Sequence, residues 1–312
     1  MSLVEKALEI LRSNGTPAVL PGRGSASAAN PATQPLRDVR KFDPSTVVEP
    51  GRRAVRIDEV ALRHGGVLAP DSEARRAADQ YRTIKRSIIK SAFGGPDATH
   101  NGQLVAVSSA LPGDGKTQTC LNVALSLALE KDHQVVLIDA DIAKPHVSRL
   151  LGIEGETGLI DVLTSKDMSV RSAILSTDHP NLWVMPAGRH SDVAMELLAS
   201  QRMRDVIDEV MRLFPHAIIL FDTSPILLTM EARVLTSMVG QVIMVVRANG
   251  TPQHAVLDSI RAIGNPSRIK LVLNQVSASG IYAYYDGRWY GYSAAGSNDN
   301  NKTSEDATHP RN

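Results

Sequence analysis

The chain has 312 residues, of which 43% are hydrophobic and 21% are charged, and its formal net charge is +1. This length and composition suffice to bury a full globular core, and the near-zero charge does not point to nucleic acid as a partner. The single cysteine, Cys120, excludes a set of disulfides. No stretch reaches the roughly 18 apolar residues of a membrane-spanning helix. We therefore expect a globular protein in the cytoplasm.

The first 53 residues divide into a predicted helix and a predicted linker. Ser2 and Glu5 fit a helix capping box, and the apolar stripe of residues 1–13 consists of Leu3, Val4, Ala7, Leu8 and Leu11. So short a helix is marginal by itself in water, and we expect it to dock on its own domain, on a partner or on a membrane surface. Residues 14–53 are rich in Pro, Gly, Ala and Ser without apolar periodicity, which predicts a disordered linker.

Two helices are predicted next. A short helix or turn covers residues 58–63, and a long helix covers residues 72–92. One face of the long helix is apolar, and the other carries six basic side chains: Arg75, Arg76, Arg82, Lys85, Arg86 and Lys90. A charged helix face is usually a solvated one.

The following stretch, LVAVSSALPGDGKTQTCLNVALSLAL, predicts a strand, a glycine-containing loop and a helix. Gly113 and Gly115 allow backbone N–H groups to converge on a phosphate, and the helix that starts near Lys116 adds the positive end of its dipole. Lys116 is expected to reach the β- and γ-phosphates, and Thr117 to bind Mg²⁺. The predicted ATP-contacting residues of the loop are Pro112, Gly113, Asp114, Gly115, Lys116, Thr117 and Gln118. Ala110 replaces the first glycine of the P-loop pattern, and the apolar helix face is predicted to comprise Leu121, Ala124, Leu125, Ala128 and Leu129.

Beyond the P-loop, apolar strands alternate with helices. Strands are predicted at residues 134–139, 182–185, 217–222, 241–247 and 269–274, and helices at 193–213 with a break near Ser200, 230–238 and 253–263. This alternation predicts an α/β domain over residues 54–276, with a mostly parallel sheet covered by helices on both faces. Ligands of such sheets bind at the carboxyl ends of the strands.

Acidic residues stand at two of these strand ends. Asp139 ends one buried strand, Asp141 follows two residues later, and Asp222 ends another strand. Carboxylates beside a P-loop are a common means of holding Mg²⁺, often through water. We predict that Thr117, Asp139 and Asp222 hold this ion. No zinc-type spacing, nucleophile elbow or dinucleotide fingerprint competes with this interpretation.

Residues 277–312 have no core pattern, which predicts a flexible tail. Five of the six tyrosines of the chain lie within it, between residues 282 and 292. Acceptor hydroxyls on a flexible tail, in a chain with an ATP site, suggest that the tail is a phosphorylation substrate. A docking role for an aromatic tail is the alternative.

With these motifs in order, the sequence resembles the bacterial tyrosine kinases (BY-kinases), most closely the tyrosine autokinases found with exosortase and PEP-CTERM exopolysaccharide loci. The matching segments are the Walker A loop SSALPGDGKTQT, the second acidic motif VLIDADIAKP, the Walker B motif IILFDTSPIL and the tyrosine cluster. The opening MSLVEKALEILR also resembles the start of the exosortase-associated group. The resemblance covers residues 55–292 and implies the P-loop NTPase fold of the ParA/MinD-like superfamily.

The resemblance implies ATP-dependent autophosphorylation that regulates exopolysaccharide synthesis or export. The implied acceptors are Tyr282, Tyr284, Tyr285, Tyr290 and Tyr292. Lys116, Asp139 and Asp141 are the predicted catalytic residues. Asp141 is the candidate acceptor of the tyrosine proton, and Asn274 matches the adenine-contacting position of the superfamily. ATP and Mg²⁺ are the implied cofactors.

The resemblance also implies partners. The family's oligomerisation motif maps approximately onto Asp79, Arg82 and Lys85, which implies ring-like self-association. A membrane-embedded Wzz-type chain-length regulator as activator and a cognate tyrosine phosphatase are implied as well, together with peripheral association with the inner membrane through a partner; nucleic acid is not. Where the family has an arginine, this chain has Ala143 followed by Lys144.

Two alternatives use the same P-loop without a kinase reaction. One is an ATPase that acts as an assembly switch, as in the ParA/MinD-type proteins, and the other is a nucleotide-binding scaffold with little turnover. Leu111 occupies the position at which the partitioning ATPases have a signature lysine. This difference and the tyrosine tail favour the kinase.

Overall fold

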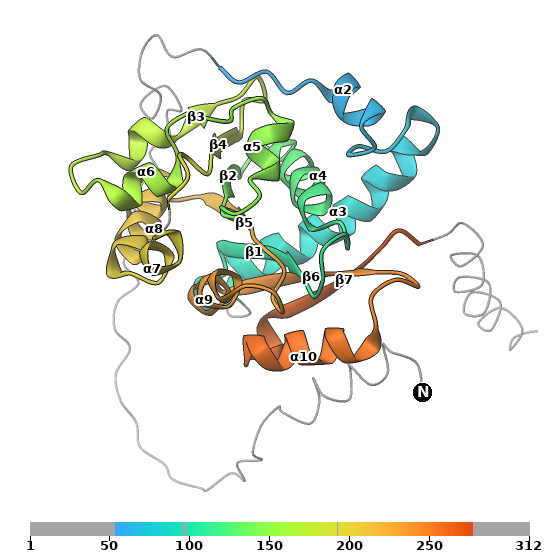
Figure 1. The fold of residues 1–312 in the computed structure, drawn as a ribbon. Helices are drawn as coiled ribbons and strands as arrows, with labels where there is room; N and C mark the ends of the chain where they lie inside the picture. Colours follow the sequence, from blue (N-terminus) through green and yellow to red (C-terminus); the bar gives the residue numbers. More distant parts are fainter. Residues whose placement is uncertain (1–53, 96–97, 192, 277–312) are drawn as a thin grey trace, which may run out of the picture. The chain divides into compact units, whose positions relative to one another are not determined.

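The structure is a computed structural model that describes residues 54–95, 98–191 and 193–276 (Figure 1). The predicted N-terminal helix and linker, residues 1–53, lie outside this range, as does the tyrosine-rich segment from residue 277 to residue 312. Residues 54–274 belong to one compact unit of the chain, and this unit is described below.

A seven-stranded sheet runs through the unit, counted over the described residues, in the order β3-β4-β2-β5-β1-β6-β7. All neighbouring pairs are parallel except β3 and β4, which pair antiparallel at one edge. The strands are β1 (Leu104–Ser109), β2 (Gln134–Asp139), β3 (Leu175–Ser176), β4 (Leu182–Met185), β5 (Ala217–Asp222), β6 (Gln241–Arg247) and β7 (Ile269–Asn274). The predicted mostly parallel α/β fold is confirmed, and the P-loop strand β1 lies between β5 and β6.

Helices cover both faces of the sheet (Figure 1). One hydrophobic core joins the sheet to α6 (Leu159–Thr164), η3 (Val170–Ala173), α7 (Ala194–Leu198), α8 (Gln201–Leu213), α9 (Met230–Met238) and α10 (Gln253–Ile263). The opposite core joins it to α2 (Glu59–His64), α3 (Asp71–Phe93), α4 (Lys116–Ala128) and α5 (His146–Leu150), and the 3-10 turn η4 (Pro266–Arg268) precedes β7. Strand β1 serves both cores, because Leu104 and Ala106 point to one and Val105 and Val107 to the other.

Two predictions of burial are wrong, one for Leu129 and one for Lys85. Leu129 is 76% exposed and lies just beyond α4 rather than on its buried face. Because α4 packs between the sheet and α3, its buried surface extends around most of the helix. The buried side chains are Lys116, Thr119, Cys120, Leu121, Val123, Ala124, Leu127 and Ala128.

Lys85, predicted on the exposed basic face of α3, is buried instead. Its ammonium group donates a hydrogen bond to the Ser126 carbonyl oxygen at 3.1 Å and lies 2.6 Å from a Glu130 carboxylate oxygen. Lys85 therefore links α3 to the end of α4. Its buried cation is tolerated because it has both a hydrogen-bond acceptor and a counter-charge. Within the described residues, no helix is both long enough and apolar enough to span a bilayer.

Candidate nucleotide-binding and active site

The P-loop connects the carboxyl end of β1 to the start of α4 at Lys116. Gly113 and Gly115 have positive φ angles of 83° and 94°, which favour glycine. A Cβ at residue 115 would collide with the side-chain amide of Asn274. Ala110 is fully buried and is not among the described positive-φ positions, so alanine fits where the P-loop pattern has its first glycine.

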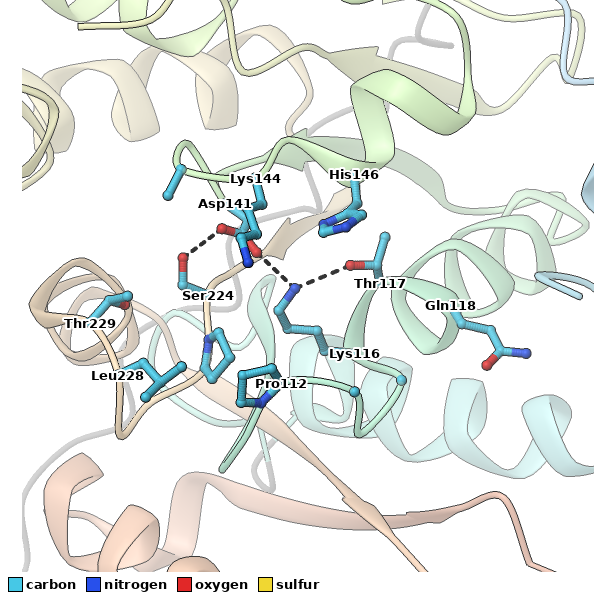
Figure 2. Close-up of a pocket in the computed structure, with 14 residues that line it drawn as sticks. Pro112, Lys116, Thr117, Gln118, Asp141, Lys144, His146, Ser224, Leu228 and Thr229 are labelled. Carbon is cyan, nitrogen blue, oxygen red and sulfur yellow. Dashed lines mark hydrogen bonds and ion pairs between the residues drawn. The ribbon is translucent and has the colours of Figure 1, made fainter. Parts of the chain in front are cut away.

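Lys116 and Thr117 contact the acidic residues that follow the neighbouring strands. The Lys116 ammonium lies 2.7 Å from an Asp141 carboxylate oxygen and 3.3 Å from the Thr117 hydroxyl (Figure 2). The Thr117 hydroxyl donates a hydrogen bond of 2.8 Å to Asp222. Burial disfavours the charged lysine, but the nearby carboxylates of Asp222 and Asp141 outweigh it and raise the pKa of Lys116.

Asp139 and Asp222 are direct neighbours in the register of β2 and β5, and both are fully buried. Asp139 accepts hydrogen bonds from the Ser148 N–H and hydroxyl at 2.8 and 2.7 Å through one oxygen. In the described structure, the other oxygen of Asp139 and one oxygen of Asp222 have no hydrogen-bond partner. Burial raises the pKa of Asp139 to about 6 and that of Asp222 to about 7.

These two unpartnered oxygens fit a Mg²⁺ site. The described part of the chain contains no group of three or more His, Cys, Asp and Glu side chains arranged to hold a metal. A closed protein cage for a metal is therefore not found there. Mg²⁺ keeps several waters and commonly uses one or two carboxylates plus substrate phosphate. A hydroxyl and two partly satisfied carboxylates at the P-loop meet that requirement.

A pocket of about 440 Å³ opens at this end of the sheet. Figure 2 shows Lys116, Asp141 and Ser224 converging on it from the P-loop, from the segment after β2 and from the segment after β5. The predicted site residues that line the pocket are Pro112, Gly113, Gly115, Lys116, Thr117, Gln118 and Asp141. Asp139 and Asp222 lie behind this surface, fully buried.

Further residues that line the pocket were not among the predicted site residues. They are Ala143, Lys144, His146, Ser224, Pro225, Leu228 and Thr229. Ser224 donates a hydrogen bond of 2.7 Å to Asp141, and its place two residues after Asp222 is the one signal that identifies it from sequence. His146 is the first residue of α5 and Leu228 lies in the connection between β5 and α9, and neither belongs to a sequence motif.

Two predicted nucleotide contacts, Asn274 and the P-loop residue Asp114, are not among the residues that line the pocket. The Asn274 amide donates a hydrogen bond of 3.0 Å to the Asp114 carbonyl oxygen. The buried Asp114 carboxylate accepts one hydrogen bond from the Leu111 N–H at 3.1 Å and another from the Thr251 hydroxyl at 2.7 Å. The residues after β6 and at the end of β7 therefore hold the P-loop in place.

Comparison with known proteins identifies relatives that cover most of the described residues. The AAA domain family model matches residues 102–265. The chain is 28% identical over 236 residues to the tyrosine-protein kinase YwqD of Bacillus subtilis, covering 74% of this chain and 96% of that one. It is also 28% identical over 229 residues to the succinoglycan biosynthesis transport protein ExoP of Rhizobium meliloti, but covers only 28% of that protein's length and 70% of its own.

Among solved structures, the kinase domain of VpsO superposes with a TM-score of 0.56 at 27% identity, over 67% of this chain and all of that one. The matched residues 102–265 contain the P-loop, both acidic strand ends and the pocket between them. The chain therefore belongs to the AAA domain family and, within it, to the bacterial tyrosine kinases.

Proposed function

We propose that the protein is an ATP-dependent tyrosine kinase that phosphorylates tyrosines of its own C-terminal segment. The observation that carries the proposal is the convergence of Lys116, Thr117, Asp141 and Asp222 at the P-loop pocket, in a chain that belongs to the bacterial tyrosine kinases. The proposed acceptors are Tyr282, Tyr284, Tyr285, Tyr290 and Tyr292, which lie outside the described residues.

ATP is proposed to bind with its phosphates on the P-loop amides and Lys116. To reach the phosphates, Lys116 must exchange its ion pair with Asp141 for one with the nucleotide. That exchange leaves the Asp141 carboxylate within the pocket, held by the hydrogen bond from Ser224. Nucleotide binding thus prepares the carboxylate that the reaction needs.

In the proposed reaction, the tyrosine oxygen forms a bond to the γ-phosphorus as the bond to the ADP oxygen breaks. The phenolic proton passes to Asp141, because a tyrosine hydroxyl has a pKa near 10 and benefits from a nearby base. Mg²⁺, proposed to be held through Thr117, Asp139 and Asp222, supplies charge neutralisation on the phosphates. The transition state is loose, so positioning by Lys116 and the loop amides contributes most to the rate.

Lys144 is proposed to take the place of the arginine that the family has one residue earlier. The Lys144 side chain lines the pocket (Figure 2), whereas Ala143, which occupies the position of the family's arginine, carries no charge. A cation at the rim of the pocket attracts the nucleotide and stabilises the charge that develops on the transferred group.

The proposed biological role is the control of exopolysaccharide synthesis or export, supported by the similarity to ExoP. Placement in the exosortase-associated group rests on the sequence motifs. We further propose a Wzz-type membrane partner as activator, a phosphatase that removes the phosphates, and self-association. Of the residues aligned with the oligomerisation motif, Asp79 and Arg82 form an exposed ion pair of 2.7 Å on α3. Lys85 is engaged inside its own chain.

The test is incubation of the purified full chain with Mg²⁺ and ATP, followed by mass-spectrometric mapping of phosphotyrosine. The matched control is Lys116→Ala. Lys116-dependent phosphate on Tyr282–Tyr292 is the expected result. If the wild type hydrolyses ATP without labelling these tyrosines, in the presence of its membrane activator as well as in its absence, the autokinase is wrong and the assembly switch is favoured.

A further inference from the structure

A second hollow lies between helices α3 and α4, apart from the P-loop pocket. Its volume is about 330 Å³, and its wall is completed by residues of α2, by Leu68 and Ala69 in the connection from α2 to α3, and by His179. The side chains that line it on α3 are Ala74, Ala77, Ala78, Tyr81, Arg82 and Lys85, and those on α4 and just after it are Asn122, Leu125, Ser126 and Leu129. We call this hollow the α3–α4 groove.

The spacing of the residues that line the groove indicates a binding site for a helix. On both walls, the lining positions include i, i+3, i+4 and i+7, the spacing by which a helix presents one continuous stripe. On α3 the stripe begins with Ala74, Ala77 and Ala78, whose small side chains let another backbone approach closely. Amphipathic helices commonly bind with their apolar face in a hydrophobic groove.

The groove also exposes apolar surface. Leu129 is 76% exposed, the largest value among the exposed large hydrophobic side chains of the described structure. Leu125 and Tyr81 are half-buried beside it, and burial raises the pKa of Tyr81. A partner that covers Leu129 and Leu125 would remove this apolar surface from water.

We propose that the α3–α4 groove binds the chain's own N-terminal segment, residues 2–12. Leu3, Val4, Ala7, Leu8 and Leu11 give this segment one apolar stripe with the same helical spacing. As a helix it would be about 16 Å long, which matches the length of α3 from Ala74 to Lys85. Docking supplies the tertiary contacts that so short a helix lacks.

The path of the chain favours binding within one molecule. The Val55 N–H donates to the Ser176 carbonyl oxygen at 2.8 Å, and the Ile57 N–H donates to the Asp178 carboxylate at 3.1 Å. The described chain therefore begins beside His179 and Glu59, which line the groove. The 41 residues between the segment and Ala54 have a typical end-to-end distance of about 35 Å as a flexible chain, well beyond the length of the groove.

Tethering gives the segment an effective concentration on the order of millimolar. At micromolar protein, the groove is therefore filled by its own segment before a second copy competes. This inference needs no kinase activity and stands apart from the proposed function.

The test is disulfide trapping in the full chain. The pair Ala7→Cys with Ala78→Cys places one thiol on the apolar stripe and one in the groove. The matched control is Ala7→Cys with Ser87→Cys, because Ser87 is exposed on α3 about 180° around the helix from Ala78. Cys120 is fully buried and does not compete.

Under mild oxidation at micromolar protein, the groove pair is expected to form a cross-link within one chain at least about tenfold faster than the control pair. Adding Leu8→Asp to the groove pair is expected to remove this advantage, with thermal unfolding checking that the domain itself is intact. Equal rates for the two pairs, or an unchanged rate with Leu8→Asp, would overturn the proposal. Cross-links that join two chains would assign the groove to a second copy instead.

Discussion

Asp139 and Asp222 lie side by side on the adjacent strands β2 and β5, and both are fully buried. Their pKa values of about 6 and about 7 exceed the ordinary value of 3.8. Between pH 4 and pH 7 the folded protein therefore holds more protons on this pair than the unfolded chain does. Since stability falls with pH wherever the folded state binds more protons, the pair makes the nucleotide-free protein less stable as the pH rises through this range.

We expect Asp222→Asn to gain stability relative to the wild type as the pH rises. The variant keeps the size of the side chain and removes its titration, so its stability relative to the wild type should rise by at least about 1 kcal/mol between pH 5 and pH 8. Urea unfolding of both proteins at several pH values, without nucleotide or Mg²⁺, measures the difference. A difference that does not change with pH would show that Asp222 titrates normally.

We expect the two P-loop glycines Gly113 and Gly115 to differ in how much stability an alanine costs. Gly115→Ala meets both an unfavourable φ of 94° and a collision with the Asn274 amide, whereas Gly113→Ala meets only the unfavourable φ of 83°. The positive φ costs about 1–2 kcal/mol at each position. Urea unfolding should therefore show a greater loss of stability for Gly115→Ala. Equal losses would mean that Asn274 moves aside without cost.

The central residues of the site were predictable from sequence, and their detailed contacts were not. Lys116, Thr117 and Asp222 are brought together because the carboxyl ends of parallel strands meet at one edge. Ser148, which holds Asp139, lies nine residues further along the chain in a helix of five residues. The position of Ser148 depends on how the connection after β2 folds back toward the sheet. The spacing of apolar residues in the sequence does not predict that path.

At the scale of elements, Lys85 joins α3 to α4. Lys85→Ala leaves the Glu130 carboxylate and the Ser126 carbonyl without their common donor. Because the lysine is buried and Glu130 is about one-third exposed, we expect a loss of about 1–3 kcal/mol in the free energy of unfolding. Arg86→Ala is the matched control on an exposed neighbour and should change stability by less than about 0.5 kcal/mol. Denaturant unfolding distinguishes the two, and similar losses would contradict the buried bridge.

The strands were more predictable than the connections between them. The five predicted strands after the P-loop and helices α9 and α10 occur with the predicted bounds, because long apolar runs and caps mark them. Strand β3 has two residues, and α5 and α6 have five and six. Elements this short repeat no pattern, and packing against the sheet defines them. The exposure of Leu129 was missed for a similar reason, because α4 ends one residue earlier.

For the whole molecule, we predict that phosphorylation occurs between subunits. The initial labelling rate per molecule should then rise with protein concentration, because each transfer requires an encounter. The measurement is the phosphotyrosine yield over a range of concentrations. A rate per molecule that does not depend on concentration would instead indicate transfer within one chain.

A mixing experiment gives the matched control. Lys116→Ala supplies tail tyrosines without a working P-loop, and a variant with all five tail tyrosines changed to phenylalanine supplies the reverse. Neither alone should be labelled, and the mixture should be labelled on the Lys116→Ala chain. Absence of label in the mixture, with a labelled wild type beside it, would contradict transfer between subunits.

Strand β1 passes through the place where the two hydrophobic cores meet, and the P-loop is its direct continuation. Loosening either core therefore disturbs the phosphate-binding loop, and occupancy of that loop stabilises both cores in return. By linkage, a nucleotide at a hundred times its dissociation constant adds about 2.7 kcal/mol to the stability of the fold. Bound nucleotide thus offsets part of the stability that a destabilising substitution removes. Substitutions on either face of the sheet will therefore be tolerated better when the P-loop is occupied.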